Sequence, residues 1–396
     1  MKKPKIVDLF SGCGGLNEGF KQAGFETLIS NDIWEPASIT FEKNNRSSGF
    51  ILGDLTKKPI RDKIISAGKG AEIIIGGPPC QAYSMAGARD VDDPRGRLFE
   101  DYVRIVKEIK PKYFVMENVM GLISMEHDRT DLKPKERKKL EEIKKLEKKK
   151  ADLLLKRKQS KNTKAIKFSR SEGKKLEEIK EALKEKRKTT SGLRVRVTET
   201  IKKRFSKLGY DVQIQVLNAA DYGVPQKRQR VIVIGGLDGY PVKFPDPSYR
   251  AKINDKNLDL FKSNMSDWVT VKDAIDDLKN EPEDIDFNHI FTKNGKDFQR
   301  KIRRTPVGKT VYGGFSDAYY RCPPNEPSRT VKENHGGVFI HYEKDRFMTP
   351  RELARLQSFK DKFLFRGTKS QILVQIGNAV PPKLGYEIAN ALKEQI

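Results

Sequence analysis

Short apolar runs that alternate with helical spans are the feature that most constrains how this chain can fold. In the first 125 residues these runs lie at 6–10, 27–30, 50–52, 73–75 and 113–116. Short apolar strands separated by helices are typical of a parallel sheet that is covered by helices on both faces. The sequence therefore predicts an α/β protein with a doubly wound sheet, which binds its ligands at the carboxyl ends of the strands.

The strand pattern returns in the second half of the chain. Residues 211–217 alternate between apolar and polar side chains, and residues 230–234 form another apolar run. Because only a short connection separates them, these strands can pair as an antiparallel hairpin at the edge of the sheet. Residues 240–346 are rich in Pro, Gly, Asp, Asn and Tyr, which predicts a smaller, loop-rich domain. A final helix from Pro382 is expected to return to the first domain.

Residues 128–190 interrupt the α/β pattern, because Lys, Glu and Arg dominate there. Within them, residues 131–190 hold 24 Lys and Arg against 11 Asp and Glu, about half of the net charge of +25. Two thin apolar stripes run through the stretch, at Leu140, Ile143 and Leu146 and at Leu176, Ile179 and Leu183. These stripes predict two charged helices joined by a loop, and the alternative is a partly disordered charged tract.

The overall charge also bears on the partner of the protein. The chain is basic outside the charged stretch as well, which favours a polyanionic partner, with nucleic acid ahead of a membrane surface.

The three cysteines are too few for a disulfide framework and predict a reducing compartment. No C-x-x-C pair occurs and the four histidines are scattered, so no metal site is expected. Neither a signal peptide nor an 18-residue apolar run is present, and we expect a cytoplasmic protein without a membrane partner.

Cys80 is the strongest candidate for a reactive group. It ends the run Gly76-Gly77-Pro78-Pro79-Cys80, which follows the apolar strand at 73–75. The two prolines fix φ and hold the thiol in one place, beside basic residues that favour the nucleophilic thiolate. A lone cysteine is otherwise more often a buried structural residue, which is the alternative here.

Glycines and acids at the ends of the first three strands predict a ligand pocket. The glycine-rich turn at 10–15 lets the backbone approach a ligand closely. Asp32 ends the second strand, where ribose hydroxyls are held in such folds, and Asp54 ends the third strand. Two acids at successive strand ends suit a nucleoside without phosphates. The alternative for each acid is a helix cap or a turn residue.

A carboxylate and a basic segment complete the candidate site. Glu117 follows the strand at 113–116 and should face Cys80, and in apolar surroundings its raised pKa would make it a proton donor. A solvated acid at a strand end is the alternative. If the chain is extended there, Gln226, Arg228 and Arg230 point the same way and could hold a base, a phosphate and the catalytic loop.

Taken together, these segments resemble the C5-cytosine DNA methyltransferases. The motifs of that family occur in order as DLFSGCGG at 8–15, GGPPCQAYS at 76–84, ENV at 117–119, PQKRQR at 225–230, RELARLQSF at 351–359 and IGNAVPP at 376–382. The resemblance covers the catalytic part and the C-terminal return, and it leaves the charged stretch and the loop-rich region unmatched.

The resemblance implies the catalytic roles. Cys80 would attack carbon 6 of a cytosine that is flipped out of the duplex, while Glu117 engages ring nitrogen 3 and the exocyclic amine. Arg230 would lie near the base carbonyl, and Arg228 would support the active-site loop. Carbon 5 would then take the methyl group, and loss of its proton would expel Cys80.

The resemblance also implies the cofactor, which is S-adenosylmethionine with S-adenosylhomocysteine as its product, and no metal. The residues expected to hold it are Phe10, Gly12, Gly14, Asp32, Ile33, Asp54, Pro78, Asn378 and Ala379. Ile33 stands where relatives often have an aromatic residue that packs on the adenine. Trp34 comes one position later, and whether it takes that role stays open.

The expected macromolecular partner is double-stranded DNA, bound by a monomer in a nucleoid-associated setting. The residues expected to contact it are Gln81, Ser84, Gln226, Arg329 and Thr330. The resemblance further implies a sequence-specific enzyme of a restriction–modification system, with a cognate restriction endonuclease as a second partner.

We expect four parts of the chain to divide this work. They are a Rossmann-like catalytic domain at 1–127 and 191–240, a charged helical insertion at 128–190, a small target-recognition domain at 241–348 and a C-terminal return at 349–396. The insertion would either bind phosphates or act as a solvated spacer. Two alternative functions are an RNA cytosine methyltransferase, which would not need so large a target-reading region, and a non-catalytic DNA-binding paralogue, which would not need the intact catalytic set.

Overall fold

The computed structural model describes residues 3–79, 94–129, 131–162, 167–252, 265–312, 319–332 and 339–396. These residues form two compact units, each with its own buried core. The first unit holds 3–79, 97–122 and the described part of 202–396, and the second holds 94–96 and the described part of 123–201.

A seven-stranded sheet with the order β3-β2-β1-β4-β5-β9-β8 forms the centre of the first unit. Its strands are β1 (Lys5–Leu9), β2 (Glu26–Asp32), β3 (Gly49–Leu52), β4 (Ile73–Gly76), β5 (Tyr113–Asn118), β8 (Tyr210–Asn218) and β9 (Gln229–Leu237). The strands from β3 to β5 pair in parallel, whereas β9 pairs antiparallel with both β5 and β8. The predicted α/β fold with antiparallel pairing at one edge is therefore confirmed, and β8 and β9 form the expected hairpin.

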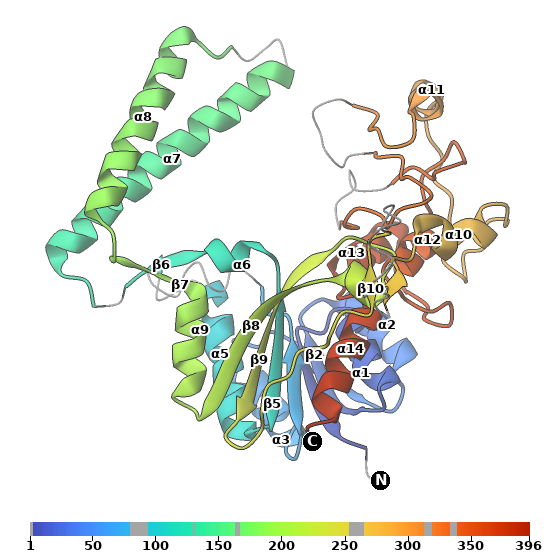
Figure 1. Ribbon diagram of the computed structural model, residues 1–396, viewed down its shortest axis with the longest axis horizontal. Coiled ribbons are helices and arrows are strands. Elements are labelled where there is room, and N and C mark those ends of the chain that lie inside the picture. The colour runs from blue at the N-terminus through green and yellow to red at the C-terminus, as the bar shows by residue number, and fades with distance from the viewer. Residues whose placement is uncertain are drawn as a thin grey trace, which may run out of the picture. The chain divides into compact units, whose positions relative to one another are not determined.

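Helices cover both faces of this sheet (Figure 1). On one face lie α1 (Gly15–Gln22) and α14 (Pro382–Lys393), and on the other lie α3 (Lys58–Ala67), α5 (Pro94–Ile109) and the C-terminal part of α9 (Val197–Ser206). A further helix, α2 (Glu35–Asn44), follows β2. The final helix thus returns to the sheet, as the sequence predicts.

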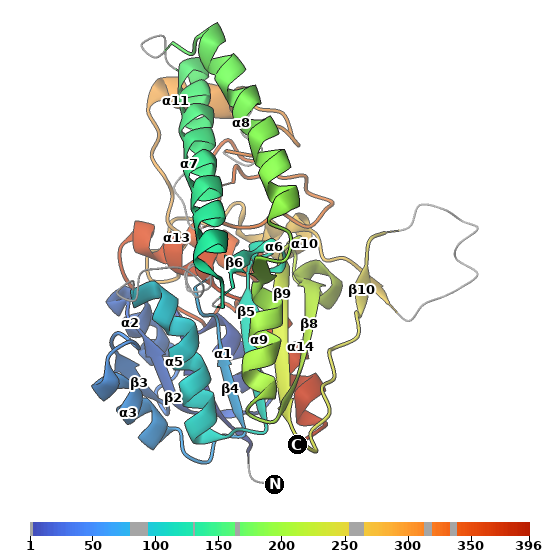
Figure 2. The ribbon, with the colours of Figure 1, turned by 90° about the vertical axis from the view of Figure 1, so that its left-hand side faces the viewer.

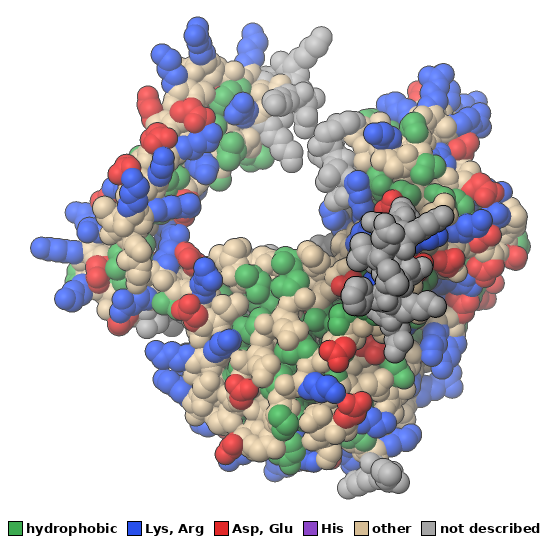
Figure 3. Space-filling model, viewed as in Figure 1, with side chains coloured by type: hydrophobic (Ala, Val, Ile, Leu, Met, Phe, Trp, Pro, Cys, Tyr) green, Lys and Arg blue, Asp and Glu red, His purple; other side chains and the backbone are tan. Residues whose placement is uncertain are grey.

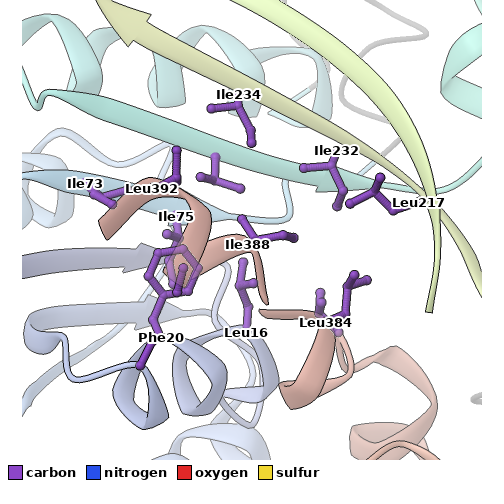
Figure 4. Close-up of a cluster of buried hydrophobic side chains, with 14 of the residues drawn as sticks. Leu16, Phe20, Ile73, Ile75, Leu217, Ile232, Ile234, Leu384, Ile388 and Leu392 are labelled. Atoms are coloured by element: carbon purple, nitrogen blue, oxygen red, sulfur yellow. The ribbon is translucent and has the colours of Figure 1, made fainter. Parts of the chain in front are cut away.

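The core beneath α1 and α14 is built mainly from aliphatic side chains of both helices and of β1, β4, β5, β8 and β9 (Figure 4). Ile73 and Ile75 of β4 are fully buried, which explains why this central parallel strand is apolar throughout. The two helices cross so closely that a Cβ at Gly19 would lie 2.4 Å from the carbonyl oxygen of Pro382. Only glycine allows this approach, and the crossing fixes the C-terminal helix against the first one.

Aromatic side chains fill the opposite face. Phe114 of β5 stacks on Phe205 of α9 with 3.9 Å between the ring centroids, and Tyr102 of α5 packs edge-on against both rings. The Tyr102 hydroxyl lies 3.4 Å from the Ile74 carbonyl oxygen and 3.3 Å from that of Val115. These two carbonyl oxygens provide the hydroxyl with hydrogen-bond acceptors inside an otherwise apolar layer.

In its described residues, the loop-rich region after residue 240 contains only short elements. They are β10 (Tyr249–Arg250), β11 (Ser266–Asp267), α10 (Val271–Ile275), the 3-10 turn η3 (Asp276–Leu278) and α11 (Lys296–Arg304), followed by α12 (Pro350–Leu356) and α13 (Lys369–Asn378). Its buried residues Val271 and Phe339 share one cluster with Leu353 and Ile372 of α12 and α13. The region is therefore packed on the C-terminal return. A capping box joins Thr349 and Glu352 at the start of α12, with proline at the first helical position, as expected.

The second unit is a helical hairpin on a small two-stranded sheet. Its elements are β6 (Glu126–Asp128), α7 (Pro134–Asn162), α8 (Arg170–Thr189) and β7 (Arg194–Arg196). Figure 2 shows α7 and α8 running side by side, and their seam buries Leu140 and Ile143 against Ile179 and Leu183. The two charged helices that the sequence predicts are thus present. None of the described helices is long and apolar enough to span a membrane.

Candidate functional site

A pocket of about 600 Å³ lies at the carboxyl ends of the central strands of the first unit. The residues that follow β1, β2, β3 and β4 line it, together with the end of β5 and the C-terminal end of α13. Of the residues expected at the cofactor, it contains Phe10, Gly12, Asp32, Ile33, Asp54, Pro78, Asn378 and Ala379. Gly14 does not line the pocket but precedes α1. A concave site of this size at the carboxyl ends of parallel strands suits a ligand of nucleoside size.

The turn after β1 forms one wall of the pocket. Phe10 and Gly12 have φ values of 55° and 54°, in the left-handed region that favours glycine. Gly14 has a φ of 93°, and a Cβ there would lie 2.8 Å from the Phe41 ring. Glycine is therefore required at position 14 for the turn to lead directly into α1.

Asp32 closes this turn from the neighbouring strand. One carboxylate oxygen accepts a hydrogen bond from the Gly12 amide at 2.8 Å, and the other accepts from the Trp34 amide at 2.9 Å. Burial raises the pKa of Asp32, and these backbone hydrogen bonds oppose the increase. Asp54 also lines the pocket, while its Oδ1 accepts from the Thr56 amide at 2.9 Å. Both acids thus organise turns, and both also face the space in which a ligand would bind.

Ile33 and Trp34 both line the pocket beside Asp32. Ile33 is 69 % exposed, whereas Trp34 is half-buried and immediately precedes α2. An indole ring at this edge can cover a flat ligand, so the tryptophan offers the aromatic surface that the isoleucine does not supply.

Asp8 is a pocket residue that our reading of the sequence missed. It lies within β1, is 1 % exposed and lines the pocket, and among the described residues its Oδ2 has no hydrogen-bond partner. Burial raises the pKa of Asp8 well above its usual range, and the negative charge of Asp32 adds to this shift. The available signal was an acidic residue inside an otherwise apolar strand, where a carboxyl is costly unless it serves a ligand or a network.

The Glu117 carboxylate is paired with Arg230. Arg230 Nε lies 2.7 Å from Glu117 Oε1, and both side chains are 13 % exposed. The two residues are brought together because β5 and β9 are neighbouring antiparallel strands. Glu117 is therefore neither in purely apolar surroundings nor a solvated strand-end acid, because a guanidinium group is its immediate neighbour.

The loop after β4 lies beside this pair. A Cβ at Gly77 would be 3.4 Å from Glu117 Oε2, and the Asn118 side chain donates to the Pro78 carbonyl at 2.8 Å. The loop that leads to Cys80 is thus held against the end of β5. Cys80 itself, with Gln81 and Ser84, lies outside the described residues.

Arg228 and Gln226 do not point with Arg230, because strand β9 begins only at Gln229. Gln226 is fully buried, and its amide is bonded to Leu356, Gln357 and Val331. It therefore has no exposed group for DNA, and the expected DNA contact of Gln226 is corrected to a structural role.

Arg228 is also buried, and its partners among the described residues lie in two other segments, whereas most of the active-site loop that it was expected to support lies outside the described residues. Its guanidinium donates to the carbonyls of Val331, Gly377 and Ala379 at 2.9 to 3.1 Å. Burial, with a contribution from Arg230, lowers the pKa of Arg228 to about 9. Arg228 thus fixes the segment that carries Asn378 and Ala379 into the wall of the pocket.

Arg329 and Thr330 lie near a second hollow next to the Glu117–Arg230 pair. This hollow is lined by Val119, Met120, Gly121, Asn218, Lys227, Gln229, Arg230, Trp268 and Thr330. The Thr330 hydroxyl donates to the Lys227 carbonyl at 3.0 Å, and the Arg329 guanidinium stacks 3.8 Å above the Tyr320 ring. Cationic and aromatic side chains beside the candidate catalytic pair suit contacts to nucleic acid.

The described residues contain no group of three or more side chains placed to hold a metal ion.

Comparison with known proteins gives the same family on both sides of residues 150–174. The model for the C-5 cytosine-specific DNA methylase matches residues 4–149 and 175–394. The Type II methyltransferase M1.HphI of Haemophilus parahaemolyticus is 32% identical over 98% of this chain and 86% of its own length. M.NgoPII of Neisseria gonorrhoeae is 31% identical over 99% of this chain and 96% of its own length.

Solved structures share the fold. A putative DNA modification methyltransferase encoded within an E. coli prophage has a TM-score of 0.65 at 23% identity, with 99% of both chains covered. The Dnmt2 methyltransferase of S. pombe has a TM-score of 0.58 at 13% identity, again with 99% of both chains covered. On the extent of the family match and the identity to the curated relatives, this chain belongs to the C-5 cytosine-specific DNA methylase family.

Proposed function

We propose that this protein is a sequence-specific DNA cytosine-5 methyltransferase in which Cys80 is the nucleophile. One observation carries the proposal: the Glu117 carboxylate, paired with Arg230 at 2.7 Å, lies beside the loop that leads to Cys80 and lines a nucleoside-sized pocket. This arrangement brings a carboxyl group and a cation to the start of the loop that carries the thiol in the sequence. Those are the groups that addition to a cytosine ring requires.

Each group has a defined task in the proposed reaction. The Cys80 thiolate forms a bond to carbon 6 of the cytosine while Glu117 delivers a proton to nitrogen 3, so that carbon 5 becomes nucleophilic. When bound, S-adenosylmethionine supplies an electrophilic methyl group to carbon 5. The carbon 5 proton then passes to solvent, the bond to sulfur breaks and the nitrogen 3 proton returns to Glu117, which restores the Cys80 thiolate and leaves 5-methylcytosine. Arg230 holds Glu117 in place and faces the base carbonyl.

S-adenosylmethionine is the cofactor of this family, and the pocket fits its nucleoside part. Asp32 and Asp54 can accept from ribose hydroxyls or the adenine amine, and Trp34 offers a ring face. The unpartnered Oδ2 of Asp8 is a further buried acceptor within the same pocket. Phe10, Gly12, Ile33, Pro78, Asn378 and Ala379 would shape the walls around the ligand, and Gly14 would act indirectly by letting the turn lead into α1.

The proposal also assigns a role to each part of the chain. Residues 1–127 and 191–240 would form the catalytic domain, residues 241–348 would read the target sequence and residues 349–396 would close the cofactor pocket. Because enzymes that act on a base must extrude it from the duplex, a flipped cytosine would occupy the site between Glu117 and Cys80. Gln81, Ser84, Arg329 and Thr330 are proposed to contact the DNA.

The setting follows from the curated relatives, which are named Type II methyltransferases. We infer that this enzyme protects DNA within a restriction–modification system, acts as a monomer in the cytoplasm at the nucleoid, and has a cognate endonuclease that cuts the same unmethylated sequence. Size-exclusion chromatography with light scattering in the presence of DNA tests the monomeric state.

The decisive assay uses the purified protein, plasmid DNA and S-adenosylmethionine with a labelled methyl group. Incorporation of label as 5-methylcytosine is expected for the wild type, and none is expected for Cys80→Ala, which should still bind duplex DNA. Label in a transfer RNA preparation but not in plasmid would assign the enzyme to RNA instead. Absence of label from both substrates, with folded protein, would favour a non-catalytic DNA-binding role.

A further inference from the structure

The positive charge of the second unit is concentrated at one end of its helical hairpin. We define residues 150–174, the end of α7, the connection and the start of α8, as the distal arm. The distal arm contains nine Lys and Arg and only two Asp and Glu, whereas the rest of residues 131–190 contains 15 and nine. Figure 3 shows how widely Lys and Arg side chains cover the visible face of the hairpin.

Outside the distal arm, three of the 15 cations pair with acids of the other helix or of β6. These ion pairs are Lys144–Asp128 at 2.6 Å, Lys186–Glu142 at 2.6 Å and Arg187–Glu147 at 2.8 Å. Pairs of this kind hold the hairpin together, and an excess of six positive charges remains over these 35 residues, against seven over the 25 residues of the distal arm. The two parts of the hairpin therefore differ in how many of their cations form ion pairs, as well as in composition.

Three cations of the distal arm are free of such pairing. Arg157, Arg170 and Lys174 are exposed and line one shallow hollow beside Ser169. Within the part of the hairpin that the structure describes, none of the three forms an ion pair, although Glu177 and Glu178 also line the hollow. Two guanidinium groups and an ammonium group around a concave surface match the size and charge of backbone phosphates.

The helices that carry these cations are well supported. Ser169 and Glu172 form a capping box at the start of α8, and the Lys156 ammonium bridges from α7 to the Glu172 carboxylate. Leu153 packs against the buried seam of the hairpin. Because α7 and α8 are already formed where Arg157, Arg170 and Lys174 lie, a polyanion that binds these cations would not have to pay for folding the helices.

The distal arm is also separate from the machinery shared by the family. The family model matches the chain up to residue 149 and again from residue 175, so the unmatched segment 150–174 is the distal arm itself. A spacer that only needed to be soluble would work with charges of both signs. An excess of one sign is expected when a segment binds a partner of the opposite charge.

We propose that the distal arm binds the phosphate backbone of duplex DNA independently of sequence, and so adds affinity that the recognised bases do not provide. The proposal rests on DNA being the substrate in the proposed function. Each phosphate contact releases counterions, so the arm should contribute most at low salt and should steepen the salt dependence of binding.

The test compares two triple variants of the full chain that remove the same charge. Arg157→Gln/Arg170→Gln/Lys174→Gln removes the unpaired cations of the distal arm. Lys180→Gln/Arg187→Gln/Lys188→Gln is the matched control, because each of its cations is paired with a glutamate of the hairpin. Binding to a fluorescent 30-base-pair duplex of random sequence is measured by anisotropy from 50 to 300 mM KCl, with circular dichroism as the check on helix content.

The distal-arm variant should reduce the slope of log K against log salt by about 2 to 3, and weaken binding at 150 mM by about 10-fold. The control should change the slope by less than about 1. Equal losses of DNA affinity in both variants would show an effect of net charge alone and would overturn the proposal. Unchanged DNA affinity in both variants would also overturn it. So would a distal-arm variant that loses affinity for single-stranded RNA but not for the duplex. Plasmid methylation by the wild type is measured in parallel, so that failure of the arm and failure of the proposed function remain distinguishable.

Discussion

The Nε atom of Arg230 lies 2.7 Å from Oε1 of Glu117, and each side chain keeps only 13 % of its surface exposed. Neighbouring strands β5 and β9 bring the two groups together, with Glu117 opposite Ile232, so the carboxyl that is proposed to protonate cytosine is oriented before substrate arrives. Preorganised charge of this kind lowers the cost of reaching the transition state.

Glu117→Gln should lower kcat by about 100-fold or more, because an amide cannot deliver a proton to ring nitrogen 3. Single-turnover methylation of plasmid DNA measures the effect. Glu100→Gln is the matched control, since Glu100 pairs with Arg204 at the same 2.7 Å on an exposed surface. A Glu117→Gln enzyme that retains more than half of the wild-type kcat would remove Glu117 from the catalytic set.

Asp32→Asn should weaken S-adenosylmethionine binding by about 10-fold. The Asp32 carboxylate accepts from two backbone amides, those of Gly12 and Trp34, and an asparagine side chain has only one oxygen to offer. Isothermal titration calorimetry with S-adenosylhomocysteine measures the change. Asp62→Asn is the control, because Asp62 forms an exposed pair with Lys58, and it should leave the affinity unaltered. Equal affinities for the wild type, Asp32→Asn and Asp62→Asn would show that the turn does not hold the cofactor.

Asp8→Asn should stabilise the protein at neutral and alkaline pH and have less effect near pH 5. Burial raises the pKa of Asp8 well above its usual range, so the folded state binds a proton that the unfolded state releases. That difference costs stability progressively as the pH rises from the unfolded pKa to the folded pKa. Melting temperatures of both proteins from pH 5 to pH 9 test this, and a difference that shrinks with rising pH would contradict it.

Gly19→Ala should lower the free energy of unfolding by about 1 to 3 kcal/mol, because the new methyl group meets backbone atoms of α14 that cannot move independently. Chemical denaturation measures the loss. Gly173→Ala is a suitable control, since a Cβ there meets only the Phe168 ring at an ordinary 3.9 Å and alanine favours the helix. A neutral Gly19→Ala would mean that the two helices do not cross as closely as described.

The parts of the fold that could be predicted are those in which local pattern and burial coincide. The run Ile73-Ile74-Ile75 is apolar because β4 is covered on both faces, so its assignment as a central strand followed from composition alone. The acids Asp32 and Asp54 could be placed at one pocket because parallel strands end at the same edge. After residue 240 no such periodicity exists, since the short elements there are stabilised by packing on α12 and α13.

The errors arose where tertiary contacts decide the direction of a side chain. Gln226 and Arg228 would point with Arg230 only if the chain were extended there, but β9 starts at Gln229 and both side chains turn inward to backbone carbonyls. Asp8 was missed because its neighbours in β1 are apolar, and only the assembled pocket shows that its carboxyl faces the ligand space. The arginine partner of Glu117 likewise depends on strand pairing that spans more than a hundred residues.

The central claim is that this chain methylates carbon 5 of cytosine in a defined DNA sequence through Cys80. Conversion sequencing of a plasmid that is co-expressed with the protein tests it most directly, at single-base resolution. The account predicts 5-methylcytosine confined to one short motif with the wild type, and an unmethylated plasmid with Cys80→Ala. An unmethylated plasmid in the presence of soluble wild-type protein, or methylation that survives in Cys80→Ala, would contradict it.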